Sequence, residues 1–259
     1  MELWSSTHIK TLPLAILCMI IIAVVLRKFL INKPLKIRAI PFMVVAFSLF
    51  VLEIFKQVLS AIDGEYDLYH IPLHYCSILI FLPTLASIGI LVFKNKDGKI
   101  NAISTATVTA TMALTIIYPC LIYSADNIKN YFNGFFDFHT VTFHNLAIFA
   151  GILLVALNIH TPNFKKNKWA ILLFIVGFCA LSSSMAQILQ TNFANFYSCN
   201  IAPLESVRQT VADACGYWPA QILYIIINSA LNLAFTLGSY GLYTLLYKIF
   251  NKKHLVKGD

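Results

Sequence analysis

Charged residues are scarce in this sequence, and that scarcity excludes a soluble globular domain. Asp, Glu, Lys and Arg make up 12% of the 259 residues, whereas a soluble domain usually carries about 25%. Hydrophobic residues make up 59%, and the mean hydropathy is +0.75. They come in blocks of about twenty residues, a length that spans a ~30 Å hydrocarbon core. The composition therefore predicts an all-α, polytopic membrane protein.

Internal repeats and low-complexity tracts are also absent, which excludes a solenoid and leaves one predicted transmembrane domain over residues 1–259. No small-residue cleavage site follows the first apolar block, and Arg27 and Lys28 close its far side. That block is therefore predicted to be a membrane anchor and not a signal peptide. We expect seven spans, at roughly residues 12–31, 40–62, 72–93, 101–123, 140–160, 169–190 and 219–247.

Acidic residues are fewer than basic ones, 11 against 19, and the net charge is +8. Such a charge is common in nucleic-acid-binding proteins, but here the basic residues lie in short connections between apolar blocks. The first, third and fifth connections and the C-terminal tail are net positive, and the other connections are net negative. Positive loops stay in the cytoplasm. We therefore predict a multi-pass cell-membrane protein with its N-terminus outside, its C-terminus cytoplasmic, and no nucleic-acid partner.

Small polar residues recur at helical spacing in three of the predicted helices. The stripe in 101–123 is interpreted as close helix packing. Those in 169–190 and 219–247 must face inward, either as interhelical hydrogen bonds or as the lining of a cavity. The three stripes are Ser104, Thr107, Thr111 and Thr115; Ser183, Gln187 and Gln190; and Asn228, Asn232, Thr236 and Ser239.

The sixth connection is the longest, and a short helix beginning at Pro203 is expected within it. Cys199 and Cys215 flank this segment on the predicted outer side. A disulfide between them and two free thiols are both compatible with the sequence.

Ionisable residues inside a span are candidates for function. The predicted topology places such groups from helices 2, 3, 5 and 6 at one level in the outer half of the bilayer, with His139 at its rim. Within this group we take Cys76 as the nucleophile, since a nearby imidazole favours the thiolate and protonates the leaving group. The supporting polar residues are Glu53, Gln57, His74, His139, Gln187, Asn192 and Asn228.

The base for Cys76 is expected to come from another helix. His74 is two residues away, about 200° round a helix, and would point to the opposite side. His144 lies at matching depth and is the predicted base, with Glu53 or an asparagine orienting its imidazole. Cys18, Cys120 and Cys179 are interpreted as packing residues, and a packing role is also the alternative for Cys76.

Two other classes of function compete with a cysteine enzyme. His70 and His74 share a helical face, and with Cys76, His139 and His144 they offer ligands for zinc. The zinc hydrolases of the alkaline-ceramidase type share the topology, but they carry a histidine pair on the last helix, which this chain lacks. We therefore predict no metal. A transporter or receptor with a polar outer-half cavity is the other alternative, and only Glu53 and Lys56 hint at it.

Two motifs resemble a known family. Residues 71–77, Ile-Pro-Leu-His-Tyr-Cys-Ser, are similar to the LPLHLCS signature of the YwaF-type integral membrane proteins, with tyrosine in place of a leucine. The stretch from Thr191-Asn192 through Pro203 to residues 216–219, Gly-Tyr-Trp-Pro, resembles that family's TN…P…GPWP segment. The resemblance covers predicted helices 2 to 7.

The resemblance implies a reaction. Animal relatives of the YwaF-type proteins are cysteine-dependent acyltransferases that move fatty acyl chains between phospholipids and lyso-ether lipids. By this resemblance Cys76 matches their acyl-accepting cysteine and His144 their histidine. We therefore expect a cofactor-independent lipid acyltransferase or acyl hydrolase that acts on phospholipid or lysophospholipid from the outer half of the bilayer.

The predicted topology is tested by reporter fusions along the chain. Fusions at Lys96 and Lys166 should report the cytoplasm, and fusions at Asp67 and Arg208 the outside, because the basic connections are retained inside. A C-terminal reporter found outside would contradict both the number of crossings and the depths assigned to the polar residues.

Overall fold

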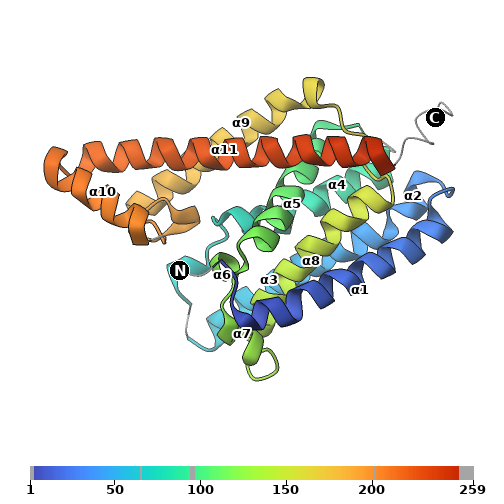
Figure 1. The fold of residues 1–259 in the computed structure, drawn as a ribbon, viewed down its shortest axis with the longest axis horizontal. Helices are drawn as coiled ribbons and strands as arrows, with labels where there is room; N and C mark the ends of the chain where they lie inside the picture. Colours follow the sequence, from blue (N-terminus) through green and yellow to red (C-terminus); the bar gives the residue numbers. More distant parts are fainter. Residues whose placement is uncertain (1–2, 65, 94–96, 201, 251–259) are drawn as a thin grey trace.

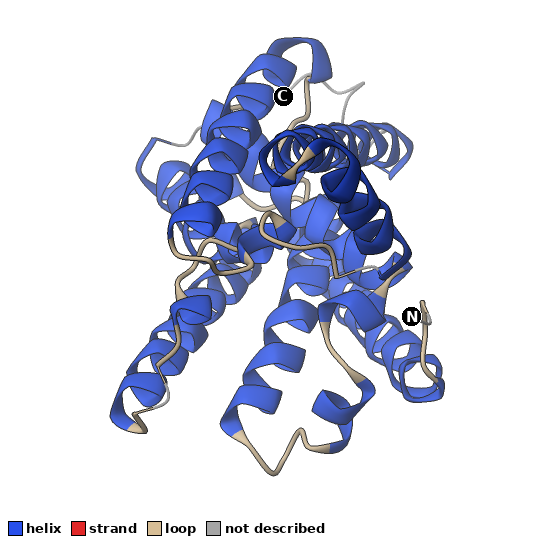
Figure 2. Ribbon diagram, turned by 90° about the vertical axis from the view of Figure 1, so that its left-hand side faces the viewer, coloured by secondary structure: helices blue, strands red, loops and turns tan. Residues whose placement is uncertain are grey.

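The structure of the protein is a computed structural model that describes residues 3–64, 66–93, 97–200 and 202–250. Over these residues the chain is helical with connecting loops and contains no strand (Figure 2). Seven helices are long and apolar enough to cross a membrane, as predicted. They are α1 (Ser6–Leu30), α3 (Ile40–Ile62), the 3-10 turn η2 (Tyr75–Ser77) continued by α4 (Ile78–Phe93), α5 (Lys99–Ile117), α8 (Phe135–Ala156), α9 (Phe164–Ile188) and α11 (Tyr217–Phe250).

Short helices and turns occupy the connections. They are α2 (Leu35–Arg38), η1 (Leu68–His70), α6 (Pro119–Ile122), α7 (Ala125–Lys129), η3 (Phe193–Asn195) and α10 (Ala202–Cys215). α10 packs against the beginning of α11 (Figure 1), where a helix starting at Pro203 was predicted. Lys94, Lys96 and the basic tail after Phe250 lie outside the described residues. The orientation of the termini across the membrane stays a prediction.

Helix α5 is the centre of the bundle. It packs against α4, α8, α9 and α11, and the small polar stripe of Ser104, Thr107, Thr111 and Thr115 is buried along it. Small side chains let helices approach closely in lipid. The hydroxyl groups of Thr107 and Thr115 donate to backbone carbonyls of their own helix, so they expose no unpaired donor. The interpretation of this stripe as helix packing is confirmed.

Four helices form the frame that carries the candidate site. α4 and α8 each pack against both α3 and α5, so they lie across from each other in the group. α1 packs on the outer side of α8, and α11 crosses the bundle at the opposite edge (Figure 1). Side chains at the starts of α4 and α8 are therefore held by the same two neighbours.

Several helix ends differ from the predicted spans by three to six residues, among them the starts of α1 at Ser6 and of α9 at Phe164, which were expected near residues 12 and 169. The helix expected from residue 72 begins with the 3-10 turn at Tyr75, because Pro72 and an extended His74 precede it. The helix expected to reach residue 123 ends at Ile117, since Tyr118 precedes a proline and leaves the helical region. The helix expected from residue 140 begins at Phe135. Hydropathy alone does not register these local breaks.

All six cysteines are free, so Cys199 and Cys215 form no disulfide. Cys199 is held instead by its backbone, whose N–H donates to Glu205 Oε2 at 2.9 Å.

Gly151 provides a test of the α5–α8 contact. A Cβ added there would stand 2.5 Å from Met112 Sδ and 3.3 Å from Met112 Cβ, whereas one at Gly177 would meet nothing within 4 Å. We expect Gly151→Ala to lower the free energy of unfolding in detergent by ~1–3 kcal/mol through overpacking. Gly177→Ala should be neutral or stabilising by up to ~1 kcal/mol. Adding Met112→Ala should rescue Gly151→Ala, and equal effects of the two glycine variants would contradict the packing.

Candidate active site

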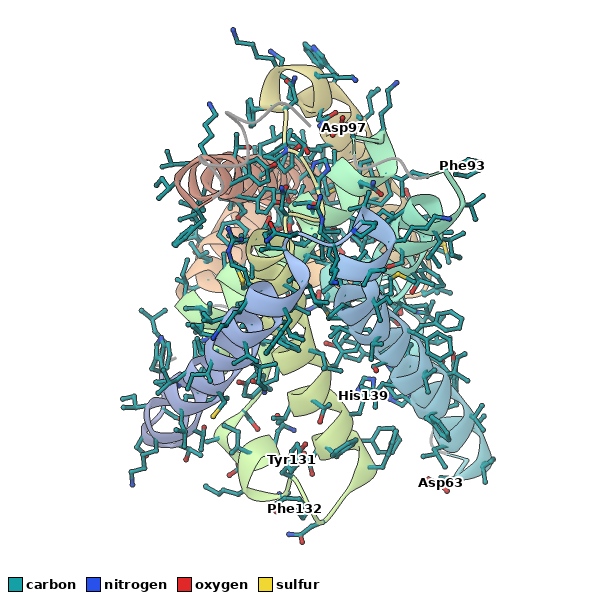
Figure 3. The ribbon with its side chains drawn as sticks, turned by 90° about the vertical axis from the view of Figure 1, so that its right-hand side faces the viewer. Asp63, Phe93, Asp97, Tyr131, Phe132 and His139 are labelled. Carbon is teal, nitrogen blue, oxygen red and sulfur yellow. The ribbon has the colours of Figure 1, made fainter. Side chains whose placement is uncertain are left out.

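Glu53 is the centre of a buried charge cluster between α3 and α8. Its Oε1 lies 2.8 Å from Lys56 Nζ, and its Oε2 lies 3.4 Å from His139 Nε2. The Glu53–His139 contact is an ion pair only when the imidazole is protonated, and its geometry is not that of a hydrogen bond. Figure 3 shows His139 on α8 directed towards α3. His139 is 6% exposed, so it is buried inside the bundle, and its depth at the rim of the outer half stays a prediction.

Gln57 links this cluster to the connection before α4. Its Nε2 donates to Glu53 Oε1 at 2.7 Å and to the His70 carbonyl at 2.6 Å. The second bond holds η1 against α3. The loop that leads into Cys76 is therefore fixed at the level of the Glu53 carboxylate.

The turn that carries Cys76 is fastened to several helices. Ser182 Oγ of α9 donates to the Leu73 carbonyl at 3.0 Å, and the Tyr75 hydroxyl lies 2.6 Å from Thr236 Oγ1 of α11. Cys76 is half-buried in the 3-10 turn that leads directly into α4, two residues before Ile78. A thiol there lies at the positive end of the helix dipole. The first N–H groups of such a helix have no intrahelical partner.

His74 is not on the helix, so the expected angle between His74 and Cys76 does not apply. It caps the turn in an extended conformation, and its Nε2–H donates to the Tyr69 carbonyl at 3.0 Å. The centroid of its ring lies 4.2 Å from that of the Tyr69 ring and 5.7 Å from that of the Phe193 ring, with the Phe193 pair in an edge-on arrangement. His74 thus joins the loop before α4 to the loop after α9.

His144 is oriented by a backbone carbonyl. Its Nδ1 lies 2.8 Å from the Thr140 oxygen, one helical turn earlier on α8. A carbonyl only accepts, so Nδ1 carries the proton and the Nε2 lone pair is free in the neutral ring. The prediction that Glu53 or an asparagine orients His144 is wrong, since Glu53 faces His139. Among the described residues, no hydrogen bond joins His144 to Cys76.

Three predicted polar residues, Asn192, Gln187 of α9 and Asn228 of α11, form a separate network around the loop that follows α9. Asn192 Oδ1 accepts from the N–H groups of Tyr197 and Ser198, and Asn228 Nδ2 donates to the Ala194 and Asn195 carbonyls. Gln187 Nε2 donates to the Phe196 carbonyl at 3.0 Å. Ala194 and Asn195 have positive φ angles, which such fixed bonds stabilise. These amides scaffold the loop.

Glu205 and Arg208 bind α10 to this loop. Arg208 Nε donates to Glu205 Oε2 and its Nη1 to Gln221 Oε1, each at 2.8 Å. The Gln221 amide then donates to the Phe196 carbonyl at 2.8 Å. Hydrogen bonds from Arg208 and from the Cys199 N–H lower the pKa of Glu205 to about 2, against the opposing effect of its partial burial. The loop is therefore tied to α9, α10 and α11.

A cysteine–histidine contact at another place in the bundle was missed by the sequence analysis. Cys120 Sγ lies 3.6 Å from His8 Nδ1, which also pairs with Ser5 Oγ at 2.7 Å. The interpretation of Cys120 as a residue without such neighbours is therefore wrong. In the predicted topology His8 and Cys120 both lie near the outer end of their helices. Comparing their depths could therefore have identified the pair, as the same comparison selected His144 for Cys76. The Tyr123 ring neighbours both His8 and His144. Its centroid lies 5.0 Å from the centroid of the His8 ring and 6.1 Å from that of the His144 ring.

The histidines and cysteines do not form a metal-binding group. Among the described residues, no three His, Cys, Asp or Glu side chains are placed to hold a metal ion. His70, His74, His139 and His144 each face a different partner: Phe136, Tyr69, Glu53 and the Thr140 carbonyl.

The Glu53 cluster yields a stability test with a matched control. Glu53→Gln leaves Lys56, whose side chain is only 17% exposed, without its counter-ion. We therefore expect a loss of ~3–5 kcal/mol in unfolding free energy, measured by denaturant titration in detergent. Asp126 and Lys129 form a pair with the same sequence spacing and the same 2.8 Å separation, but their side chains are 75% and 63% exposed. Asp126→Asn should cost less than ~1 kcal/mol. Equal losses would mean that burial does not strengthen the Glu53 pair.

Comparison with known families gives one match. The model of the TMEM164 family, a family of membrane proteins, matches residues 3–240. No curated protein and no solved structure matches the chain. The matched residues include all of the Glu53 cluster, the Cys76 turn, His144 and the loop that follows α9. Because the match covers nearly the whole chain, the protein belongs to the TMEM164 family.

Proposed function

We propose that this protein is a cysteine-dependent lipid acyltransferase of the cell membrane that transfers a fatty acyl chain between glycerophospholipids, with hydrolysis as the same reaction when water is the acceptor. Cys76 is the nucleophile and His144 the base. The proposal is consistent with the TMEM164 family membership. It is also supported by the resemblance of the Cys76 motif to the signature of the YwaF-type proteins, whose animal relatives are lipid acyltransferases.

One observation carries the proposal: the proton on His144 is fixed at Nδ1 by the Thr140 carbonyl. An imidazole acts as a base only through an unprotonated nitrogen, and Nε2 is therefore the basic atom. In serine and cysteine enzymes a carboxylate or amide usually holds the imidazole in this tautomer. Here a backbone carbonyl of α8 performs that role within a single helical turn.

The first half of the reaction forms an acyl-enzyme. His144 Nε2 accepts the Cys76 thiol proton, and the thiolate attacks the carbonyl carbon of a phospholipid ester. A backbone N–H at the start of α4 holds the oxyanion. As the C–S bond forms, the ester C–O bond breaks, and the imidazolium gives its proton to the departing lysolipid oxygen.

The second half returns the enzyme to its starting state. The hydroxyl group of an acceptor lipid gives its proton to Nε2 and attacks the thioester carbon. A new C–O bond forms, the C–S bond breaks, and the departing thiolate takes the proton back from the imidazolium, which restores the thiol and the neutral imidazole. One ester is exchanged for another, so the transfer needs neither an oxidant nor a cofactor.

The thioester provides the test. We expect Cys76→Ser to fold and insert normally but to lose acyl transfer and labelling by thiol-reactive lipid probes, because a hydroxyl is a far weaker nucleophile. His144→Ala should lower kcat by ~10²–10⁴. Protein reconstituted with phospholipid should carry an acyl group on Cys76 that hydroxylamine releases, detected by mass spectrometry of the intact protein.

Cys179→Ser is the matched control, because Cys179 is a 2% exposed packing residue of α9. It should retain both transfer and labelling. Full activity of Cys76→Ser together with an unstable His144→Ala would show that both residues are structural, and the enzymatic proposal would then be abandoned.

A further inference from the structure

A cavity of about 480 Å³ lies between α1 and α8 and is covered at one end by α7 and Tyr123. This volume is in the range of small-molecule sites, ~300–1,000 Å³. Most of the lining is aliphatic or aromatic. α1 contributes Leu12, Ala15, Met19 and Ile22, and α8 contributes Leu146 and Phe149.

The cavity has the dimensions of one lipid leaflet. On α1 its lining runs from Thr11 to Ile22, a rise of about 16 Å at 1.5 Å per residue. Half of a ~30 Å hydrocarbon core is about 15 Å. The outer face of α1 is apolar and exposed, with Leu14 62% and Leu17 53% exposed, so the cavity adjoins the hydrocarbon of the bilayer. An extended chain from one leaflet matches this length and lining.

The polar groups of the cavity gather at the end near α7. Tyr123, Tyr131, Thr142 and Asn145 line it there, and the Tyr131 hydroxyl lies 3.0 Å from Thr142 Oγ1. Figure 3 shows Tyr131 at that end of α8. The centroids of the Tyr123 and His144 rings are 6.1 Å apart, and Asn145 follows His144 in sequence. The polar end of the cavity therefore borders the imidazole.

We propose that this cavity binds the acyl chain of the lipid substrate, with the chain end near Ile22 and Phe149 and the ester or hydroxyl end at Tyr123 and Asn145 beside His144. The choice of a lipid occupant rests on the proposed function. The position of the cavity gives that function a substrate path which enters from the bilayer between α1 and α8, so the lipid need not leave the membrane.

The inference is tested by a binding measurement that requires no activity. In the Cys76→Ser background, reconstituted protein is photolabelled with a lysophosphatidylcholine that bears a diazirine at the chain terminus, and the labelled peptides are mapped by mass spectrometry. We expect labels near Met19, Ile22 and Phe149. A probe with the diazirine next to the ester should move the label towards Tyr123 and Asn145.

Three substitutions on α1 provide a test variant, its matched control and a replacement. Ala15→Phe places a ring inside the cavity and should reduce labelling about tenfold if it displaces two methylene groups of the chain. Leu17→Phe adds a ring to the exposed face of the same helix and should leave labelling unchanged. Met19→Trp fills the cavity from the next turn and replaces Ala15→Phe if that variant does not fold.

The outcomes separate this inference from the proposed function. Labelling at these positions without any acyl transfer by the native protein would retain the chain-binding cavity and reject the transferase. Acyl transfer with labels on other helices, or with labelling unaffected by Ala15→Phe and Met19→Trp, would reject the cavity and retain the transferase.

Discussion

A buried carboxylate has to be neutralised, and the arrangement of the site follows from how Glu53 meets that requirement. An ionised carboxylate in a low-dielectric interior is costly unless it is paired and hydrogen-bonded. Glu53 pairs with Lys56 and accepts a hydrogen bond from Gln57, both on its own helix, and it faces His139 of α8. These contacts fix α8 against α3, and the second Gln57 hydrogen bond fixes η1 beside them. The loop before Cys76 and the helix that carries His144 are thereby held by one charge.

The remaining supports are neutral. α5 packs closely against four neighbours because its contact face is made of serine, threonine and alanine. The amides of Gln187, Asn192 and Asn228 satisfy backbone groups of an irregular loop whose only regular element among the described residues is the short 3-10 turn η3. Irregular backbone that is buried away from water requires such partners. His74 connects this loop to the Cys76 turn through Phe193.

In the proposed enzyme the charged cluster and the apolar packing lie on different sides of α8. The Glu53 cluster gives rigidity on the α3 side of α8, whereas the α1 side is apolar and holds the cavity. α1 packs mainly on α8 and exposes most of its surface, so it is the helix that separates the cavity from lipid. A rigid catalytic face beside a wall open to lipid suits an enzyme whose substrate diffuses in the membrane plane.

The sequence by itself determined the number of spanning helices, the helix before α11 and the burial of the α5 stripe. Hydrophobic length and helical periodicity report these features directly, because each depends on residues close together in the chain. The sequence also selected Glu53, His139, Cys76 and His144, since an ionisable or reactive side chain within an apolar block is conspicuous.

Only the tertiary structure decided the partners of those residues. Glu53 faces His139 and not His144, the Thr140 carbonyl orients His144, and Cys120 meets His8. Depth along a helix can be counted from the sequence, but the direction in which a side chain points depends on the rotation of each helix and on breaks such as those at Pro72 and Pro119. Those rotations are set by the packing of all the helices together, which no local pattern encodes.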